Sequence, residues 1–160
     1  MKARSVFCVL VLLGMLLLCS CAERETPSPR KVCEKLAESG VLGDGILYDS
    51  RASADDESYL DSKLLGALYA RSDGTYDAED IASVAIYLGS SSREHRELAV
   101  FSCRGLDSAR EVAALCRSRA AMIGEAGGSE PRILIYGETV VFLAHPDPGR
   151  AERMLDAIYK

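Results

Sequence analysis

Two histidines are the residues of this chain best suited to act as general bases near neutral pH. His145 begins a His-Pro-Asp triplet, and the carboxylate of Asp147 could orient its imidazole ring for proton abstraction. Asp147 also stands directly before Pro148, however, where an N-cap residue and a first-turn proline begin a helix. His95 lies in a charged run, residues 93–97, that is typical of a solvated connection. The sequence therefore predicts no catalytic residue, and a hydrolase that uses His145 is kept only as an alternative.

Three cysteines, Cys33, Cys103 and Cys116, lie well inside the chain. The expected strand places Cys103 on the same face as Phe101, and the expected helix after it places Cys116 on its apolar stripe. Because that helix must run back over the strand, the two thiols could form a disulfide that closes a loop of about 14 residues and contributes about 3 kcal/mol. The alternative is that both are free thiols that fill the core. A redox role is not expected, because there is no CxxC motif and no cationic neighbour to stabilise a thiolate.

The remaining polar clusters do not have the spacing of a metal or phosphate site. A metal ion needs several ligands that converge within about 2.0–2.6 Å, and two isolated histidines with three dispersed cysteines do not form that pattern. The acidic run Asp55-Asp56-Glu57 lacks the turn glycine and spaced ligands of a calcium loop. We therefore expect no metal and no cofactor.

The N-terminal segment has the layout of an export signal with a lipid attachment site. Lys2 and Arg4 precede an uncharged apolar stretch, residues 6–18, that is too short to span a bilayer. The segment 18–21, with the sequence LCSC, resembles the lipobox of bacterial lipoproteins. The resemblance implies that residues 1–20 form a signal peptide that is removed, and that Cys21 becomes the lipidated first residue. The alternatives are an ordinary signal peptide that is cut elsewhere, or an uncleaved anchor helix.

Charge and composition limit the partners of the mature chain. Cleavage before Cys21 would remove two basic residues and no acidic one, so the net charge would change from −5 to −7. An acidic surface repels nucleic acid and has no polybasic segment that would bind anionic lipids. We therefore expect attachment at the extracytoplasmic face of the cell membrane through the lipid, with no nucleic acid partner. Residues 21–29 would form the lipidated N-terminus and tether, and residues 30–160 one globular domain.

Hydrophobic periodicity indicates an α+β domain. A helix is expected from Ser28 to Gly40 and another after Asp61, followed by strands over 82–88 and 98–103. The longest helix is expected to follow the capping box formed by Ser108 and Glu111.

The pattern after this helix indicates a second strand pair and a final helix. Strands over 133–136 and 139–144 flank Gly137-Glu138, which fits a type II′ hairpin turn, and a helix is expected after Asp147. We expect a two-layer domain, with a four-stranded antiparallel sheet covered on one face by helices, in the order β-β-α-β-β-α after the N-terminal helices.

Residues 60–160 resemble a family of small bacterial lipoproteins catalogued as domain of unknown function number four-three-five-eight. The features that carry the resemblance are an apolar helix ending in Tyr69, a strand with the sequence VAIY (84–87), the segment ELAVF (97–101) that follows it, and the segment TVVFL (139–143) after a glycine turn. It implies a surface lipoprotein and supplies no active site to transfer.

We therefore expect a lipid-anchored, non-catalytic domain that binds or scaffolds another protein of the cell envelope. One alternative is a small-ligand module on the uncovered face of the sheet, with Tyr87 lining the site. These hypotheses predict different surfaces: a binding protein needs an exposed apolar patch, and a ligand module needs a concave pocket of about 300 Å³ or more.

Overall fold

The computed structural model describes residues 26–71, 75, 79–90, 95–126 and 130–160 of the chain. Its helices in this part are α2 (Pro29–Glu38), α3 (Ser62–Tyr69), α4 (Leu106–Glu125) and α5 (Pro148–Tyr159). Its strands are β1 (Gly45–Asp49), β2 (Ile81–Gly89), β3 (Glu97–Cys103), β4 (Arg132–Tyr136) and β5 (Thr139–Ala144). The α+β class and the β-β-α-β-β-α order from β2 to α5 are confirmed.

The sheet has five strands rather than the expected four. All neighbours are antiparallel, in the order β1-β2-β3-β5-β4, so β1 and β4 are the two edges. The additional strand is β1, which pairs Ile46 with Leu88 and Tyr48 with Ile86. Its apolar run is short and follows a glycine turn, which is why no strand was predicted there.

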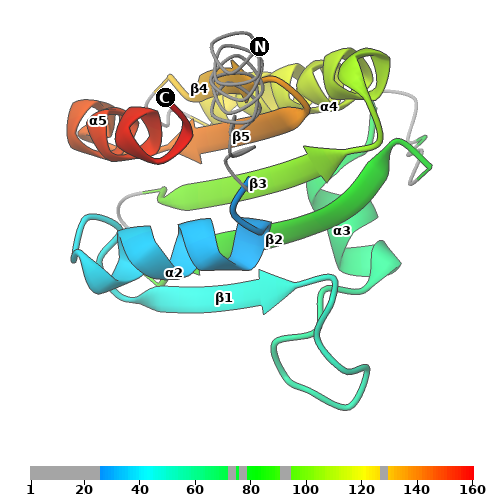
Figure 1. The fold of residues 1–160 in the computed structure, drawn as a ribbon, viewed down its shortest axis with the longest axis horizontal. Coiled ribbons are helices and arrows are strands. Elements are labelled where there is room, and N and C mark those ends of the chain that lie inside the picture. The colour runs from blue at the N-terminus through cyan, green and yellow to red at the C-terminus, as the bar shows by residue number, and fades with distance from the viewer. Residues whose placement is uncertain (1–25, 72–74, 76–78, 91–94, 127–129) are drawn as a thin grey trace, which may run out of the picture.

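Helices cover both faces of the sheet, so the prediction of a two-layer domain with one open face is wrong (Figure 1). On one face, α3 and α4 pack over a cluster that includes Val84, Ile86 and Phe101; we call this face 1. On the other, α2 and α5 pack over Ala85, Tyr87 and their neighbours, which we call face 2. Central strands whose alternate residues are apolar in both directions need such double cover.

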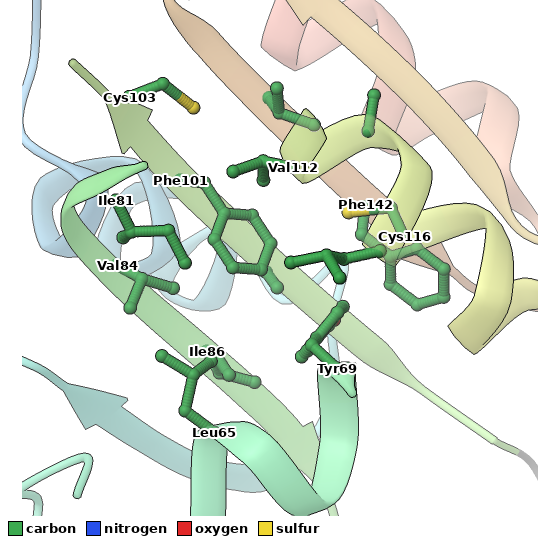
Figure 2. Close-up of a cluster of buried hydrophobic side chains, with 14 of the residues drawn as sticks. Leu65, Tyr69, Ile81, Val84, Ile86, Phe101, Cys103, Val112, Cys116 and Phe142 are labelled. Carbon is green, nitrogen blue, oxygen red and sulfur yellow. The ribbon is translucent and has the colours of Figure 1, made fainter. Parts of the chain in front are cut away.

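Aromatic rings fill the centre of face 1. Tyr69, at the end of α3, makes edge-to-face contacts with Phe101 and Phe142, with ring centroids 5.0 and 5.7 Å away. Figure 2 shows these side chains meeting Val112 and Cys116 of α4 over the strands. This arrangement packs the C-terminal end of α3 and the helix α4 against the central strands β3 and β5.

Local signals for helix ends and turns are partly confirmed. Asp61 caps α3 by accepting a hydrogen bond from the backbone N–H of Leu64 at 2.6 Å, and Gly40 follows α2 with φ 73°. Gly137 has φ 60°, which agrees with the expected type II′ turn between β4 and β5. The expected capping box at Ser108 is wrong, because the N-cap of α4 is Gly105, three residues earlier.

Candidate functional site

Cys21, the predicted lipidation site, lies outside the described residues, as does the whole of the predicted signal peptide. Among the helices of the described part of the chain, none has the length and apolar character needed to cross a membrane. Lipidation of Cys21 therefore stays a prediction.

His145 is buried, and its ring contacts the backbone rather than a catalytic partner. Its Nδ1 lies 2.7 Å from the carbonyl oxygen of Asp147 and 3.0 Å from the Asp147 nitrogen. The carboxylate of Asp147 was expected either to orient this ring or to cap α5, but the structure gives it neither contact. The ring thus fixes the turn into α5, because its nitrogen bonds to the main chain of that turn.

The thiols of Cys33, Cys103 and Cys116 are all free and buried. Figure 2 shows the Cys103 side chain apart from that of Cys116, although both belong to face 1. Burial raises the pKa of Cys103 to about 11, with smaller contributions from the charges of Asp80 and Glu138, and burial also raises the pKa of Cys116. The structure therefore agrees with the alternative of free, buried thiols, and Cys103 and Cys116 form no disulfide in it. Because these thiols are buried and protonated, they are poor nucleophiles.

Tyr87 does not line an open face. It is 6% exposed, packs in the face 2 cluster, and its hydroxyl donates a hydrogen bond to the carbonyl oxygen of Gly43 at 2.5 Å. This contact ties β2 to the loop before β1, so Tyr87 is a packing residue.

The polar cluster that the sequence did not reveal is centred on Glu97, at the start of β3. Its side chain is fully buried, and it accepts hydrogen bonds from the hydroxyl of Tyr69 at 2.6 Å and from Nη2 of Arg119 at 2.7 Å. Nε2 of His95 lies 2.9 Å from Oε2 of Glu97, the carboxylate oxygen to which Nη2 of Arg119 also donates. His95 is exposed, as predicted, with 37% of its side chain accessible, but its ring also reaches the buried carboxylate. We call Tyr69, His95, Glu97 and Arg119 the Glu97 cluster.

The electrostatics of the Glu97 cluster favour the ionised carboxylate. Burial alone would raise the pKa of Glu97, but hydrogen bonds from His95, Arg119 and Tyr69 outweigh it and lower the pKa below the ordinary value. Burial and the neighbouring Glu97 charge raise the pKa of Tyr69 well above its usual range. Both carboxylate oxygens are occupied by donors from α3, α4 and the segment before β3. The cluster therefore fastens these elements together rather than presenting a reactive group to a substrate.

Metal ligation finds no support within the part of the chain that the structure describes. No group of three or more His, Cys, Asp or Glu side chains is placed there to hold an ion.

The two edge strands of the sheet differ in how many of their backbone N–H and C=O groups form no hydrogen bond within the described residues. At the β1 edge, the N–H of Asp49 donates to the carbonyl of Ser58 at 2.8 Å, and Asp49 accepts from the N–H of Leu60 at 3.1 Å. Asp49 also bridges Tyr59, so the end of this edge is closed by its own chain.

The β4 edge has no such cover among the described residues, because none of their backbone groups outside the sheet forms a hydrogen bond with β4. The two-residue turn makes Tyr136 and Thr139 the closing hydrogen-bonded pair, so alternate residues Leu134 and Arg132 also bond to β5. The N–H and C=O groups of Ile133 and Ile135 therefore point away from the sheet. The side chain of Ile135 is 52% exposed at the same edge.

No family model, curated protein or solved structure matches this chain. The resemblance to a family of small bacterial lipoproteins therefore stays a prediction.

Proposed function

We propose that this protein is a lipid-anchored domain of the cell envelope, held at the extracytoplasmic face of the membrane through Cys21, and that it binds an envelope protein without catalysing a reaction. The anchor rests on the lipobox-like segment 18–21. The binding role rests on the open β4 edge.

The β4 edge favours one kind of partner, an extended apolar segment that adds a sixth strand. Only an extended backbone presents alternating N–H and C=O groups that satisfy those of Ile133 and Ile135. Apolar side chains of such a segment would pack against Ile135, which is 52% exposed. Natural proteins usually blunt a free edge with charge or proline, and Pro131 sits directly before β4. That proline limits the pairing to a short segment.

The other functions considered have less support. A small-ligand site at Tyr87 needs an open sheet face, and α2 and α5 cover that face. A hydrolase at His145 needs a carboxylate or nucleophile beside the ring, and the ring nitrogen instead contacts the backbone of Asp147.

The anchor is tested by intact-mass spectrometry of protein purified from membranes. We expect a chain that begins at Cys21 and carries the added mass of acyl groups. An unmodified terminus, or a start at another residue, would overturn the anchor while leaving the binding edge untouched.

The binding edge is tested by photo-crosslinking in intact membranes, with the crosslinking amino acid at position 132, a half-exposed position of β4. We expect one partner whose crosslinked peptide is an extended apolar segment, and we expect Ile135→Pro to abolish the crosslink because it removes an outward N–H. Proline is tolerated at such outward positions of edge strands, so the variant should still fold. Ile135→Lys should also abolish the crosslink.

The matched control is Ile46→Lys, which changes an isoleucine of similar exposure, 55%, on the β1 edge. It should leave the crosslink intact. A partner that is lost equally with Ile46→Lys, or retained with Ile135→Pro, would show that β4 is not the binding edge.

A further inference from the structure

A cavity of about 360 Å³ opens between α2 and the C-terminal end of α5. Its lining is amphiphilic: Val32, Ile158 and Tyr159 provide apolar surface, and Lys31 and Lys35 provide two ammonium groups. A second cavity of about 330 Å³ adjoins it and shares Lys31 and Thr26. Both cavities lie where the described chain begins, at Thr26.

The two lysines are not neutralised within the described residues, unlike most charges around them. Arg30 pairs with Glu34 at 2.7 Å, and Lys160 pairs with Asp156 at 2.9 Å. Lys31 and Lys35 are four residues apart on α2, have no ion pair in this part of the chain, and face one cavity. Like charges at this spacing destabilise a helix slightly. An anion placed between them would reverse that effect.

The length of the tether places this cavity near the bilayer. Cys21 and Thr26 are five residues apart in the sequence, and five fully extended residues span at most about 17 Å. A domain of this size has a diameter of about 35 Å or more, since its radius of gyration is about 14 Å. A lipid on Cys21 therefore keeps Thr26 within about 17 Å of the bilayer, which is about half the diameter of the domain.

We propose that face 2 rests on the membrane surface, with Lys31 and Lys35 bound to the phosphate groups of anionic lipids and the apolar floor of the cavity against the glycerol region. This inference rests on the proposed anchor at Cys21. An acyl chain in the cavity would leave both ammonium groups without an anion, whereas a lipid headgroup satisfies the charged and apolar parts together. The net negative charge of the whole chain does not oppose this arrangement, because at physiological salt charges are screened beyond about 8 Å. The acidic residues on the same two helices near the lysines, Glu34 and Asp156, are paired with Arg30 and Lys160.

This orientation would also serve the β4 edge. The sheet then lies roughly parallel to the bilayer, so its edge strands point along the membrane plane, as the layer arrangement in Figure 1 implies. A membrane-bound partner could then reach β4 from the side.

The test uses the full lipidated protein in vesicles of neutral phosphatidylcholine, with or without one anionic component, phosphatidylglycerol. A fluorophore is placed on Ala157→Cys, in the cavity lining, or on Ala67→Cys, an exposed residue of α3 on face 1. Quenchers on the lipid headgroups report which face is close to the bilayer. The native cysteines are buried and label poorly, and the unsubstituted chain measures that background.

We expect stronger quenching at position 157 than at 67, an increase when phosphatidylglycerol is added, and a loss of this increase at high salt. Lys31→Glu with Lys35→Glu should reduce the preference for this orientation by at least about fivefold per lysine, because a basic residue at an anionic surface contributes about 1 kcal/mol and the new carboxylate is repelled. The matched control reverses two exposed charges on face 1, Lys63→Glu with Arg117→Glu, and should leave the quenching unchanged.

Flotation with neutral vesicles separates the two proposals. A protein that does not float with neutral vesicles has no lipid anchor, which would overturn the proposed anchor and this inference together. A protein that floats but is quenched equally at both positions, or is insensitive to the lysine reversal, would overturn only the orientation.

Discussion

The two faces of the sheet hold their buried carboxylates in different ways. On face 1, Glu97 is bound by three side chains from α3, α4 and the segment before β3. On face 2, Asp49 accepts a hydrogen bond from the backbone N–H of Arg51 at 2.9 Å, and the half-exposed Arg30 lies 3.5 Å away. Both faces are packed with apolar side chains, but face 1 adds an ionic network around its carboxylate, whereas face 2 has only a backbone hydrogen bond and one half-exposed cation beside its own.

This difference indicates a division of roles between the faces. The charges of the Glu97 cluster are all used internally, so face 1 has a structural task. Face 2 keeps Lys31 and Lys35 unpaired within the described residues and lies beside the tether. The following variants test whether the faces differ in this way.

The largest expected effect comes from removing the main cation of face 1. Arg119→Ala should lower the free energy of unfolding by about 3–5 kcal/mol, because it leaves the buried Glu97 carboxylate without its principal partner. Chemical denaturation measures this loss. The matched control is Arg110→Ala on the same helix, whose ion pair with Asp107 is exposed and should contribute less than about 1 kcal/mol. Equal losses for the two variants would show that the Glu97 cluster has no special structural weight.

On face 2 the largest loss should come from an apolar residue. Leu155→Ala on α5 removes a fully buried side chain and should cost about 3 kcal/mol, since the cavity it leaves cannot fully collapse. Denaturant melts of the single variants and the double variant with Arg119→Ala provide the measurement. We expect the two losses to add within about 0.5 kcal/mol, because the sheet separates the two sites. Strong non-additivity would contradict the independence of the faces.

The sequence predicted strands β2 to β5 because each has a clear apolar alternation, and it predicted all four helices from apolar spacing together with capping residues. Double cover of the sheet was missed, although Val84 and Ile86 point one way and Ala85 and Tyr87 the other, a pattern of strands buried on both faces.

The Glu97 cluster was missed for two reasons. The apolar alternation predicts a strand that starts at residue 98 and so leaves Glu97 outside it, although Glu97 is in phase with the buried residues Ala99 and Phe101. Its partners Tyr69 and Arg119 are 28 and 22 residues away in the sequence, and no local pattern reports contacts of that separation. A carboxylate in phase with a buried strand face is the signal that could have found it.

Acid should weaken face 1 selectively. The pKa of Glu97 is lowered in the folded state, so its contribution is fully present above the unfolded value of about 4.3 and is lost as the pH falls through the folded pKa. In this window the unfolded chain binds more protons, so stability rises with pH. Glu97→Gln should therefore differ most from the native protein near pH 6 and least at low pH, as measured by denaturation at several pH values. Glu111→Gln, at an exposed pair with Arg71, is the control and should show little pH-dependent difference. A constant difference for Glu97→Gln at all pH values would contradict the ionised, buried carboxylate.

The smallest expected effect is that of a reductant on the cysteines of the two faces. Cys103 and Cys116 are free thiols on face 1, and Cys33 is a free thiol on face 2, so dithiothreitol should leave the melting temperature unchanged. A bridge between Cys103 and Cys116 would close a loop of about 14 residues worth about 3 kcal/mol, and its reduction would lower the melting temperature by about 10 °C. Alkylation of the unfolded, unreduced protein followed by peptide mapping gives an independent reading, with each of the three thiols expected to be modified. A disulfide-linked peptide pair would show that Cys103 and Cys116 are oxidised in the cell envelope. β3 and α4 would then be joined covalently, and face 1 would have this bond as a constraint in addition to its ionic network.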